Sequence, residues 1–370
     1  MLDLFILTGE ASGDLLGASL ISELLKQNPK MRIGAMAGPR MRQLPIETFF
    51  RMEDLQVMGF IDVFLALPKI VKSFFAIRKK ILELKPKAVL SIDYPGFNLR
   101  MARSLKKKGF QGLLIHYVCP SVWAWGKKRI ALMEKNLNLL LTFFPFEKPL
   151  FSSSRLQVEH VGHPLMHVIA PNKESRSHTL ALFPGSRTKE IEKNLPLQIK
   201  VAKEIQSQDP KMGIAISISH IEKEPLIRSL TQGVVCTYIP PEGAYSLMKT
   251  AKAALATSGT VTLELALHNT PTIVQYYIRP LDVFLAQKIF RIHLPFYCIV
   301  NILADKEVFP ELFGPNLTFK NLLNTTQNLW FYPQNQTSFQ EVRELLTNLD
   351  ASKQAAYWIL KRMGLSVEND

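Results

Sequence analysis

Cysteine is scarce in this chain, and the few cysteines are not paired in sequence. There are three, Cys119, Cys236 and Cys298, and no two of them form a CxxC motif. An odd and widely spaced set argues against a disulfide framework and against a cysteine zinc site. We therefore expect a protein of a reducing compartment.

Long apolar runs are absent as well. No uninterrupted apolar stretch reaches the roughly 18 residues that a membrane-spanning helix needs. The first apolar run is cut short by residues 9–14 (GEASGD), so a secretory signal is not expected either. The sequence predicts a protein that touches a membrane at most at its surface.

Acidic residues are outnumbered by basic ones. The chain has 45 Lys and Arg against 31 Asp and Glu, and this net charge of +14 favours partners that carry phosphate. Nucleic acid, an anionic membrane and a phosphorylated substrate all qualify. A nucleic-acid groove needs aligned cations beside stacking aromatics. The cations here are dispersed, apart from residues 106–108 and 127–129, so nucleic acid is not an expected partner.

What the chain does contain is an alternation of short apolar runs with amphipathic helical patterns. Such runs, which lack polar alternation, predict parallel strands covered by helices on both faces. The runs lie at 4–7, 33–37, 88–92, 113–118, 137–144 and 158–161, and after a polar stretch at 180–183, 214–218, 234–239, 253–256 and 272–275.

This pattern predicts an α/β protein with two Rossmann-like domains whose parallel sheets face each other across a cleft. The first domain is expected at 1–165, a linker at 166–178, and the second domain at 179–337. A C-terminal helical segment at 338–370 can pack on either domain.

Two apolar runs in the second half end abruptly in small residues and give way to a helical pattern. They are residues 180–187 (LALFPGSR) and 254–260 (ALATSGT). The first turn of a helix offers unpaired N–H groups and the positive end of the helix dipole, so both junctions suit anions. Together with Arg187 they suggest a diphosphate clamp. Glu264, one helical turn beyond Thr260, is placed to accept hydrogen bonds from ribose hydroxyls, which indicates a nucleoside diphosphate.

Carboxylates follow two strands of the first half. Glu10 and Asp14 come after the first strand, and Asp93 ends the strand at 88–92. Ligands of open α/β sheets bind beyond the carboxyl ends of the strands, which makes these side chains candidates for a site. Each has a structural alternative. Asp93 can stabilise its own turn, and Glu10 and Asp14 can simply favour a helix N-terminus.

Histidines and tryptophans of the first half are less informative. His116 lies inside an apolar strand and is interpreted as a core residue. Trp123 and Trp125 precede three cations, which suits a phosphorylated sugar or a lipid head group, or else they anchor a loop on the core. His163 follows the last strand of this half, where it either faces the cleft or belongs to a turn.

Residues 64–84 combine bulky apolar side chains with cations. Phe74 and Phe75 lie between Lys72 and a run of three cations at 78–80. A helix of this kind can lie in a membrane interface. An ordinary amphipathic helix that packs on the sheet has the same pattern, and both interpretations stay open.

Taken together, these motifs resemble those of the lipid-A-disaccharide synthases, glycosyltransferase family 19, which are membrane-associated enzymes of Gram-negative lipid A assembly. Their order and spacing match over nearly the whole chain. The matching positions are 9–14 (GEASGD), 37–41 (AGPRM), 57–59 (VMG), 92–93 (ID), 97–98 (FN), 116–118 (HYV), 120–125 (PSVWAW), 144–147 (FPFE), 161–163 (VGH), 184–187 (PGSR) with Glu190, 258–260 (SGT) with Glu264, Pro280, Asn301 and 310–311 (PE).

The resemblance implies a GT-B fold, with the donor nucleotide on the second domain and the acceptor largely on the first. It implies an inverting transfer that needs no metal ion and no cofactor. A diacylated glucosamine would pass from UDP-2,3-diacylglucosamine to the 6-hydroxyl of 2,3-diacylglucosamine 1-phosphate. The products would be a β-1,6-linked disaccharide 1-phosphate and UDP.

The resemblance also assigns roles to residues. Asp93 is the general base that matches the family, and Glu10 is a second catalytic candidate. The expected donor contacts comprise the diphosphate clamp, Glu264 on the ribose, Glu190 orienting Arg187 or touching the donor, and Asn301 approaching the diphosphate from the other side. The clamp consists of Gly185, Ser186, Arg187, Ser258, Gly259 and Thr260.

Location and assembly follow from the same resemblance. It implies a peripheral protein on the cytoplasmic face of the inner membrane, with an anionic surface as partner, and a homodimer that exchanges C-terminal segments. Cys119 and residues 313–314 depart from the residues common in the family. The alternatives are another UDP-sugar GT-B enzyme, such as a UDP-N-acetylglucosamine 2-epimerase or the muramyl-lipid N-acetylglucosaminyltransferase, and a non-enzymatic basic protein that binds membrane or nucleic acid.

Overall fold

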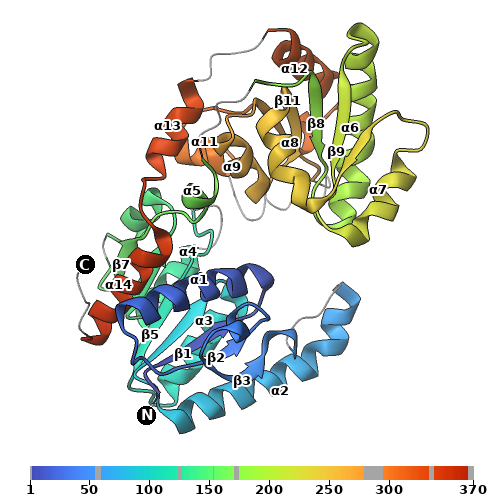
Figure 1. Ribbon diagram of the computed structural model, residues 1–370. Coiled ribbons are helices and arrows are strands. Elements are labelled where there is room, and N and C mark those ends of the chain that lie inside the picture. Colours follow the sequence, from blue (N-terminus) through green and yellow to red (C-terminus); the bar gives the residue numbers. More distant parts are fainter. Residues whose placement is uncertain are drawn as a thin grey trace. The chain divides into compact units, whose positions relative to one another are not determined.

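The chain forms two compact units, each built on one parallel β-sheet (Figure 1). One unit comprises Met1–Pro164 with Asn348–Asp370, and the other comprises Leu165–Thr347. The structure is a computed structural model, and it describes residues 2–54, 60–123, 127–152, 154–170, 175–278, 295–332 and 337–365. Motif positions 57–59, 124–125 and Pro280 lie outside the described residues.

The first unit contains a seven-stranded sheet in the order β3-β2-β1-β4-β5-β6-β7. Its strands are β1 (Leu4–Thr8), β2 (Ile33–Ala37), β3 (Glu47–Arg51), β4 (Ala88–Ile92), β5 (Leu113–Tyr117), β6 (Leu139–Thr142) and β7 (Gln157–His160). All neighbouring pairs are parallel. The chain moves outward from β1 to β3 and then returns beside β1 with β4, so the strand order reverses between β1 and β4.

Helices cover both faces of this sheet because its central strands are apolar on both sides. Leu4 and Ile6 of β1 pack with the helices α1 (Ala11–Gln27) and α14 (Ala351–Met363). Phe5 and Leu7 point to the opposite face, where they pack with α2 (Phe60–Leu84) and α3 (Pro95–Lys107). The other helical segments are α4 (Lys127–Asn136) and the 3-10 turns η1 (Met41–Gln43), η2 (Met52–Asp54) and η3 (Pro145–Phe151). This two-sided burial is typical of a parallel sheet.

The second unit contains a six-stranded parallel sheet in the order β10-β9-β8-β11-β12-β13. Its strands are β8 (Thr179–Phe183), β9 (Gly213–Ser217), β10 (Thr237–Ile239), β11 (Ala253–Thr257), β12 (Thr272–Tyr276) and β13 (Glu311–Phe313). The strand order reverses between β8 and β11. In doubly wound sheets such a reversal opens a crevice at the carboxyl ends of the two strands.

The helices of the second unit also lie on both faces of their sheet. Leu180 and Leu182 of β8 pack with α6 (Thr188–Gln208) and α12 (Phe319–Phe331), whose Trp330 is fully buried. The helices α8 (Ala244–Thr250) and α9 (Thr260–Leu267) contact β8, β9, β11 and β12. The remaining segments are α5 (Leu165–Val168), α7 (Glu224–Leu230), α11 (Ile299–Ala304), α13 (Thr337–Leu345), η4 (Ile221–Lys223), η5 (Pro241–Gly243) and η7 (Gly314–Asn316).

Every apolar run that the sequence indicated forms a strand, but two strands were not predicted. The edge strand β3 is exposed or half-buried along its length, so it lacks a continuous apolar run. The strand β13 has three residues, too few for a pattern. Short edge strands leave little trace in a sequence, because little of their surface is buried.

The C-terminal segment 338–370 divides between the units. Helix α13 contacts α9 and α11 of the second unit. Helix α14 lies along α1 of the first unit, as the red and blue helices in Figure 1 show. Gly162 and Leu349 meet where the chain leaves the first unit and returns to it. A Cβ atom at Gly162 would lie 2.6 Å from the carbonyl oxygen of Leu349.

Helix α2 packs on the sheet with one face and leaves apolar side chains on the other. Ile77 and Ile81 are buried in the core. Val71 and Phe75 remain 44% and 50% exposed, and the guanidinium of Arg78 lies 4.8 Å from the ring centre of Phe75. Among the described residues, no helix combines the length and apolar character needed to span a bilayer.

Candidate functional site

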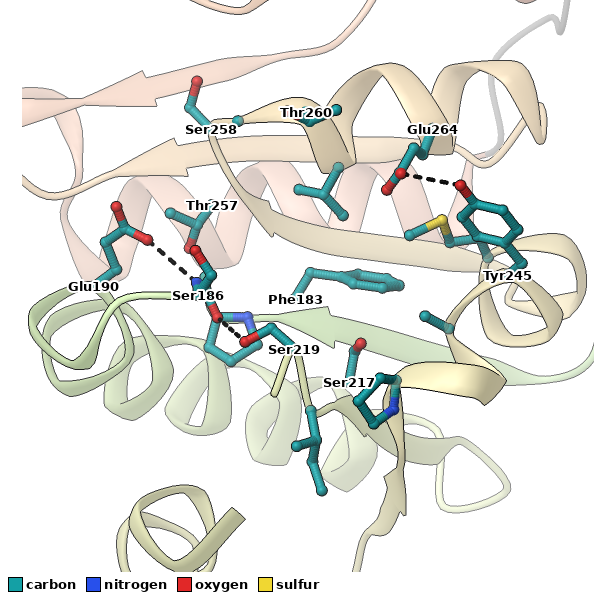
Figure 2. A pocket seen from close by; sticks show the side chains of 18 residues that line it. Phe183, Ser186, Glu190, Ser217, Ser219, Tyr245, Thr257, Ser258, Thr260 and Glu264 are labelled. Carbon is teal, nitrogen blue, oxygen red and sulfur yellow. Dashed lines mark hydrogen bonds between the residues drawn. The ribbon is translucent and has the colours of Figure 1, made fainter. Parts of the chain in front are cut away.

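A cavity of about 480 Å³ lies at the reversal point of the second sheet (Figure 2). Its size falls in the range of small-molecule sites. The walls come from the carboxyl ends of β8, β9 and β11 and from the helices α6, α8 and α9. The lining residues are 183–186, Glu190, 217–219, Pro241, 244–245, Met248, 257–261 and Glu264.

The junction between β11 and α9 presents an uncapped helix N-terminus to this cavity. Gly259 is the N-cap residue, and no described side chain caps the helix there. The Thr262 hydroxyl donates to the Gly259 carbonyl oxygen at 2.7 Å. The Thr262 N–H donates to the same carbonyl oxygen at 3.1 Å. The Ser258 N–H donates to the carbonyl oxygen of Gln275 in β12 at 3.0 Å. The N–H groups of Thr260 and Val261 begin the helix beside the cavity, a position that suits an anion.

The junction between β8 and α6 is arranged differently, because Glu190 of α6 folds back onto it. Glu190 Oε2 accepts hydrogen bonds from the backbone N–H groups of Ser186 and Arg187, both at 3.2 Å. Its Oε1 accepts from Arg187 Nη1 at 2.7 Å. Gly185 has φ +109°, and a Cβ atom there would lie 2.8 Å from Glu190 Oε2. A larger residue would displace this carboxylate.

Arg187 does not line the cavity. Its side chain is 80% exposed and is held only by Glu190 among the contacts described. The expected pairing of Glu190 with Arg187 is present, but the expected clamp is only partly assembled. Gly185, Ser186, Ser258, Gly259 and Thr260 line the cavity, whereas the guanidinium of Arg187 lies outside it.

The other end of the cavity carries Glu264. Its Oε1 accepts a hydrogen bond from the Tyr245 hydroxyl at 3.2 Å. Burial raises the pKa of the Glu264 carboxyl, and the hydrogen bond from Tyr245 opposes that shift. Figure 2 shows Glu264 and Tyr245 at one end and Ser186, Glu190 and Ser258 at the other, with Phe183 between them. The predicted diphosphate contacts and the predicted ribose contact therefore lie at opposite ends of the cavity.

Asn301 is not part of this cavity, contrary to its predicted approach to a diphosphate. The side chain is fully buried in α11. Its Nδ2 donates to the Phe309 carbonyl oxygen at 2.7 Å and to Glu311 Oε1 at 2.8 Å, and its Oδ1 accepts from the N–H groups of Val308 and Phe309. With both ends of the amide used, Asn301 fixes the turn that leads into β13.

Several cavity residues were not predicted from the sequence. Ser217 ends β9 and Ser219 follows it, and the Ser219 hydroxyl donates to the Gly185 carbonyl oxygen at 3.2 Å. Small polar residues directly after a predicted buried strand were a usable signal for them. Tyr245 and Met248 of α8 had no such signal, because an aromatic and an apolar residue in a helix normally indicate core packing.

In the first unit, Glu10 and Asp93 follow the two strands between which the strand order reverses. Thr8 of β1 and Ile92 of β4 are paired in register, so both carboxylates begin from the same sheet edge. Glu10 is exposed at the N-terminus of α1, and Asp93 is half-buried. Burial raises the pKa of the Asp93 carboxyl, which makes it a stronger base than an exposed aspartate.

The turn that carries Asp93 is strained. Asp93 and Tyr94 have φ of 49° and 45°, a region that non-glycine residues seldom adopt. Asn98 holds the turn by donating from Nδ2 to the carbonyl oxygen of Asp93 at 2.7 Å. The Tyr94 ring covers Gly9, where a Cβ atom would lie 2.4 Å from it. Such strain persists only where surrounding contacts enforce it, and it clusters at functional sites.

The side chains of Asp14, His116 and His163 in the first unit are buried. Asp14 is buried and accepts from the backbone N–H groups of Arg40 and Met41 at 2.8 and 3.2 Å. His116 is a buried core residue, as predicted, and burial lowers its pKa to about 4. His163 packs against Phe143 and Phe144, and burial lowers its pKa to about 4 as well.

Solved structures share the fold of this chain at low sequence identity. The S. aureus MnaA–UDP co-structure has a TM-score of 0.63 at 12% identity, covering 100% of this chain and 99% of that one. The glycosyltransferase of kitacinnamycin reaches 0.61 at 12% identity, covering 97% and 98%. Together with the two parallel sheets, these neighbours confirm the predicted α/β fold of GT-B type. The expected cleft between the domains stays a prediction.

Sequence comparisons identify the family. The family model described as lipid-A-disaccharide synthetase matches residues 4–357. The lipid-A-disaccharide synthase of Blochmanniella pennsylvanica is 33% identical over 373 residues, covering 96% of this chain and 95% of the relative. That of Chlamydia pneumoniae is 38% identical over 328 residues, covering 85% of this chain but 54% of the relative, so the chain spans about half the length of the chlamydial protein. The chain therefore belongs to the lipid-A-disaccharide synthase family.

Proposed function

We propose that this chain is the glycosyltransferase that joins two diacylglucosamines in lipid A assembly. The donor is UDP-2,3-diacylglucosamine and the acceptor is 2,3-diacylglucosamine 1-phosphate. The observation that carries the proposal is the cavity at the β8/β11 reversal, with an open helix N-terminus at one end and Glu264 at the other. Family membership supports the choice of a lipid A sugar over other UDP-sugars.

The donor binds with its diphosphate at the N-terminus of α9. The first-turn N–H groups and the helix dipole hold the phosphate oxygens, and the Ser186 hydroxyl faces the same end of the cavity. Arg187 reaches the diphosphate by rotating its exposed side chain away from Glu190. Stabilisation of the leaving UDP by fixed dipoles and a guanidinium needs no divalent ion. Neighbours of the same fold solved with UDP support uridine as the base.

The acceptor is activated by Asp93. Its carboxylate takes the proton of the 6-hydroxyl while that oxygen attacks the anomeric carbon of the donor. The bond between the anomeric carbon and the β-phosphate oxygen breaks, and UDP leaves with the electron pair. Attack opposite to the leaving group inverts the anomeric centre and gives the β-1,6 linkage. Glu10, on the same sheet edge, is the second acidic group available to the acceptor.

The proposal includes a peripheral position on the cytoplasmic face of the inner membrane. The net charge of +14 suits an anionic surface, and Val71, Phe75 and Arg78 of α2 combine exposed apolar area with a cation. A homodimer is also part of the proposal, and sedimentation in detergent would test it. Loss of vesicle binding when Phe75 is replaced by serine would support the membrane surface.

The central test is product formation in detergent micelles with EDTA, followed by mass spectrometry. We expect a tetra-acylated disaccharide phosphate and one UDP for each turnover. If the chain binds UDP but makes no product from these substrates, the donor site stands and the acceptor assignment is wrong. Conversion of UDP-N-acetylglucosamine without any lipid acceptor would instead identify a 2-epimerase.

A further inference from the structure

The ribose end of the cavity contains a second side chain whose role is not explained by packing alone. Tyr245 is the second residue of α8, it is half-buried, and its hydroxyl donates to Glu264 Oε1 at 3.2 Å. Both residues line the cavity. In Figure 2 they face each other from different helices, at the end opposite to Ser186 and Glu190.

Without a partner, the carboxylate of Glu264 would have neither a fixed orientation nor a fixed ionisation state. Glu264 is half-buried, and burial raises the pKa of its carboxyl, which disfavours the charged form. A protonated carboxyl is a weaker partner for a ribose hydroxyl, since it has lost its negative charge. The Tyr245 hydroxyl favours the ionised form and occupies Oε1, which leaves Oε2 to accept from a ligand.

Arg176 bridges the C-terminal ends of α8 and α9, the two helices that carry Tyr245 and Glu264. Its Nη1 donates to the carbonyl oxygens of Met248, Lys249 and Ala251 at the end of α8, at 2.8–3.3 Å. Its Nη2 donates to the carbonyl oxygens of His268 and Asn269 at the end of α9, at 2.8 and 2.7 Å. One guanidinium therefore sets how α8 lies against α9.

The ring of Tyr245 is supported from below by His268. The two ring centres are 5.3 Å apart at 59°. Burial and the nearby cations Arg176, Lys249 and Arg343 lower the pKa of His268 to about 4, so the imidazole is neutral at physiological pH. Tyr245 therefore packs against an uncharged imidazole, and its hydroxyl is hydrogen-bonded to Glu264 without a ligand.

We infer that Tyr245 is a positioning residue of the nucleoside subsite: it holds Glu264 so that one carboxylate oxygen is aimed at the ribose hydroxyls, and Arg176 keeps the two helices in register. This inference rests on the proposed function, because it requires a nucleoside diphosphate in the cavity. On this inference, binding of the ribose depends on Tyr245, whereas binding of the diphosphate does not.

The test compares UDP with 2′,3′-dideoxyuridine diphosphate by titration calorimetry on the full chain. The wild-type protein should prefer UDP, and Tyr245→Phe should reduce that preference about tenfold, the size of a hydrogen bond to a charged group. The affinity for the dideoxy analogue should stay within about twofold of wild type. Glu264→Ala, which removes the acceptor, should abolish the preference, and adding Tyr245→Phe to it should change nothing more.

Tyr238→Phe is the matched control. It removes a hydroxyl that pairs with Thr231 at 2.6 Å in the same unit, away from the cavity lining, and should leave the preference intact. If Tyr245→Phe weakens both ligands equally, or leaves the preference unchanged, Tyr245 does not position Glu264. If wild-type protein binds UDP and the dideoxy analogue equally, the ribose subsite itself is wrong. If it binds neither, the proposed function fails, and the inference fails with it.

Discussion

The carboxylate of Glu190 lies 3.2 Å from the backbone nitrogen of Ser186, where an anion bound by the first turn of α6 would lie. The same oxygen also accepts from Arg187 N–H. One of the two helix N-termini expected to clamp a diphosphate is therefore occupied by a carboxylate of its own helix. At the N-terminus of α9, no described side chain accepts hydrogen bonds in this way.

Replacing Glu190 by glutamine should tighten the binding of UDP. The amide oxygen can still accept from the Ser186 and Arg187 N–H groups, while the negative charge that opposes a phosphate is removed. A charge at a helix terminus is worth ~0.3–1 kcal/mol, which corresponds to an increase of up to about fivefold in affinity. Titration of UDP at low and high salt checks this, because the gain should shrink as salt screens it.

Glu192→Gln is the control for Glu190→Gln. It removes the same charge from an exposed position of the same helix, outside the cavity, and should leave UDP affinity unchanged. Weaker binding by the Glu190 variant would show that Glu190 contacts the donor directly and is not a competitor.

Asp93→Asn should lower turnover by ~10²–10⁴-fold, the usual contribution of a general base. UDP binding should not change, because Asp93 belongs to the first unit and the nucleotide cavity to the second. Steady-state rates and UDP titration on the same preparation separate the two effects. Near-wild-type turnover in this variant would remove Asp93 from the role of base.

The pH dependence of kcat/KM should carry the signature of Asp93. A base must be ionised to act, so the rate should rise with pH through the pKa of this carboxyl. Burial raises that pKa, and the acidic limb should therefore lie above the ~3.9 of an unperturbed aspartate. A rate profile that stays flat down to pH 4 would contradict the burial argument.

Stability should fall as pH rises from about 6.5 to 8 because of Glu147. This residue is buried in η3, where it accepts from the Phe144 N–H at 3.0 Å, and burial raises the pKa of its carboxyl to about 8. The folded state then retains a proton that the unfolded state has lost, so stability drops by on the order of 1 kcal/mol per pH unit. His116 and His163, whose pKa values are lowered to about 4, affect stability only below pH 6.5, where stability rises with pH.

Urea unfolding at pH 6.5 and 8 measures the effect of Glu147. Glu147→Gln should flatten the dependence in this window, because glutamine can accept from the same N–H and does not titrate. An unaltered slope in the variant would assign the dependence to another group.

Arg176→Lys should loosen the ends of α8 and α9. An ammonium has three donors, whereas the guanidinium of Arg176 serves five backbone carbonyl oxygens and the Thr270 hydroxyl. We expect faster hydrogen exchange in peptides that cover 244–270, corresponding to a local loss of ~2–4 kcal/mol. Arg187→Lys, at an 80% exposed site, should leave that exchange unchanged. If peptides 244–270 exchange at the same rate in the Arg176 and Arg187 variants, Arg176 does not hold the ends of α8 and α9 together.

Local sequence was sufficient for the strands other than β3 and β13, and for the strand ends that form the proposed sites. Runs such as 88–92 and 253–256 lack polar alternation, which is typical of a parallel sheet covered by helices on both faces. The small residues after β8 and β11 identified the two junctions, because few other residues allow a strand to turn so tightly into a helix. The family motifs are also properties of the sequence alone.

Tertiary structure decided which of these groups are available to a ligand. Glu190 and Asn301 both appeared as donor contacts, yet one is turned onto its own helix and the other is saturated inside the core. Tyr245 and Arg176 had no local signal, since their partners lie 19 and more than 70 residues away in the sequence. Periodicity and strand ends are local and can be read along the chain. The partner of a buried polar group depends on contacts that only folding brings together.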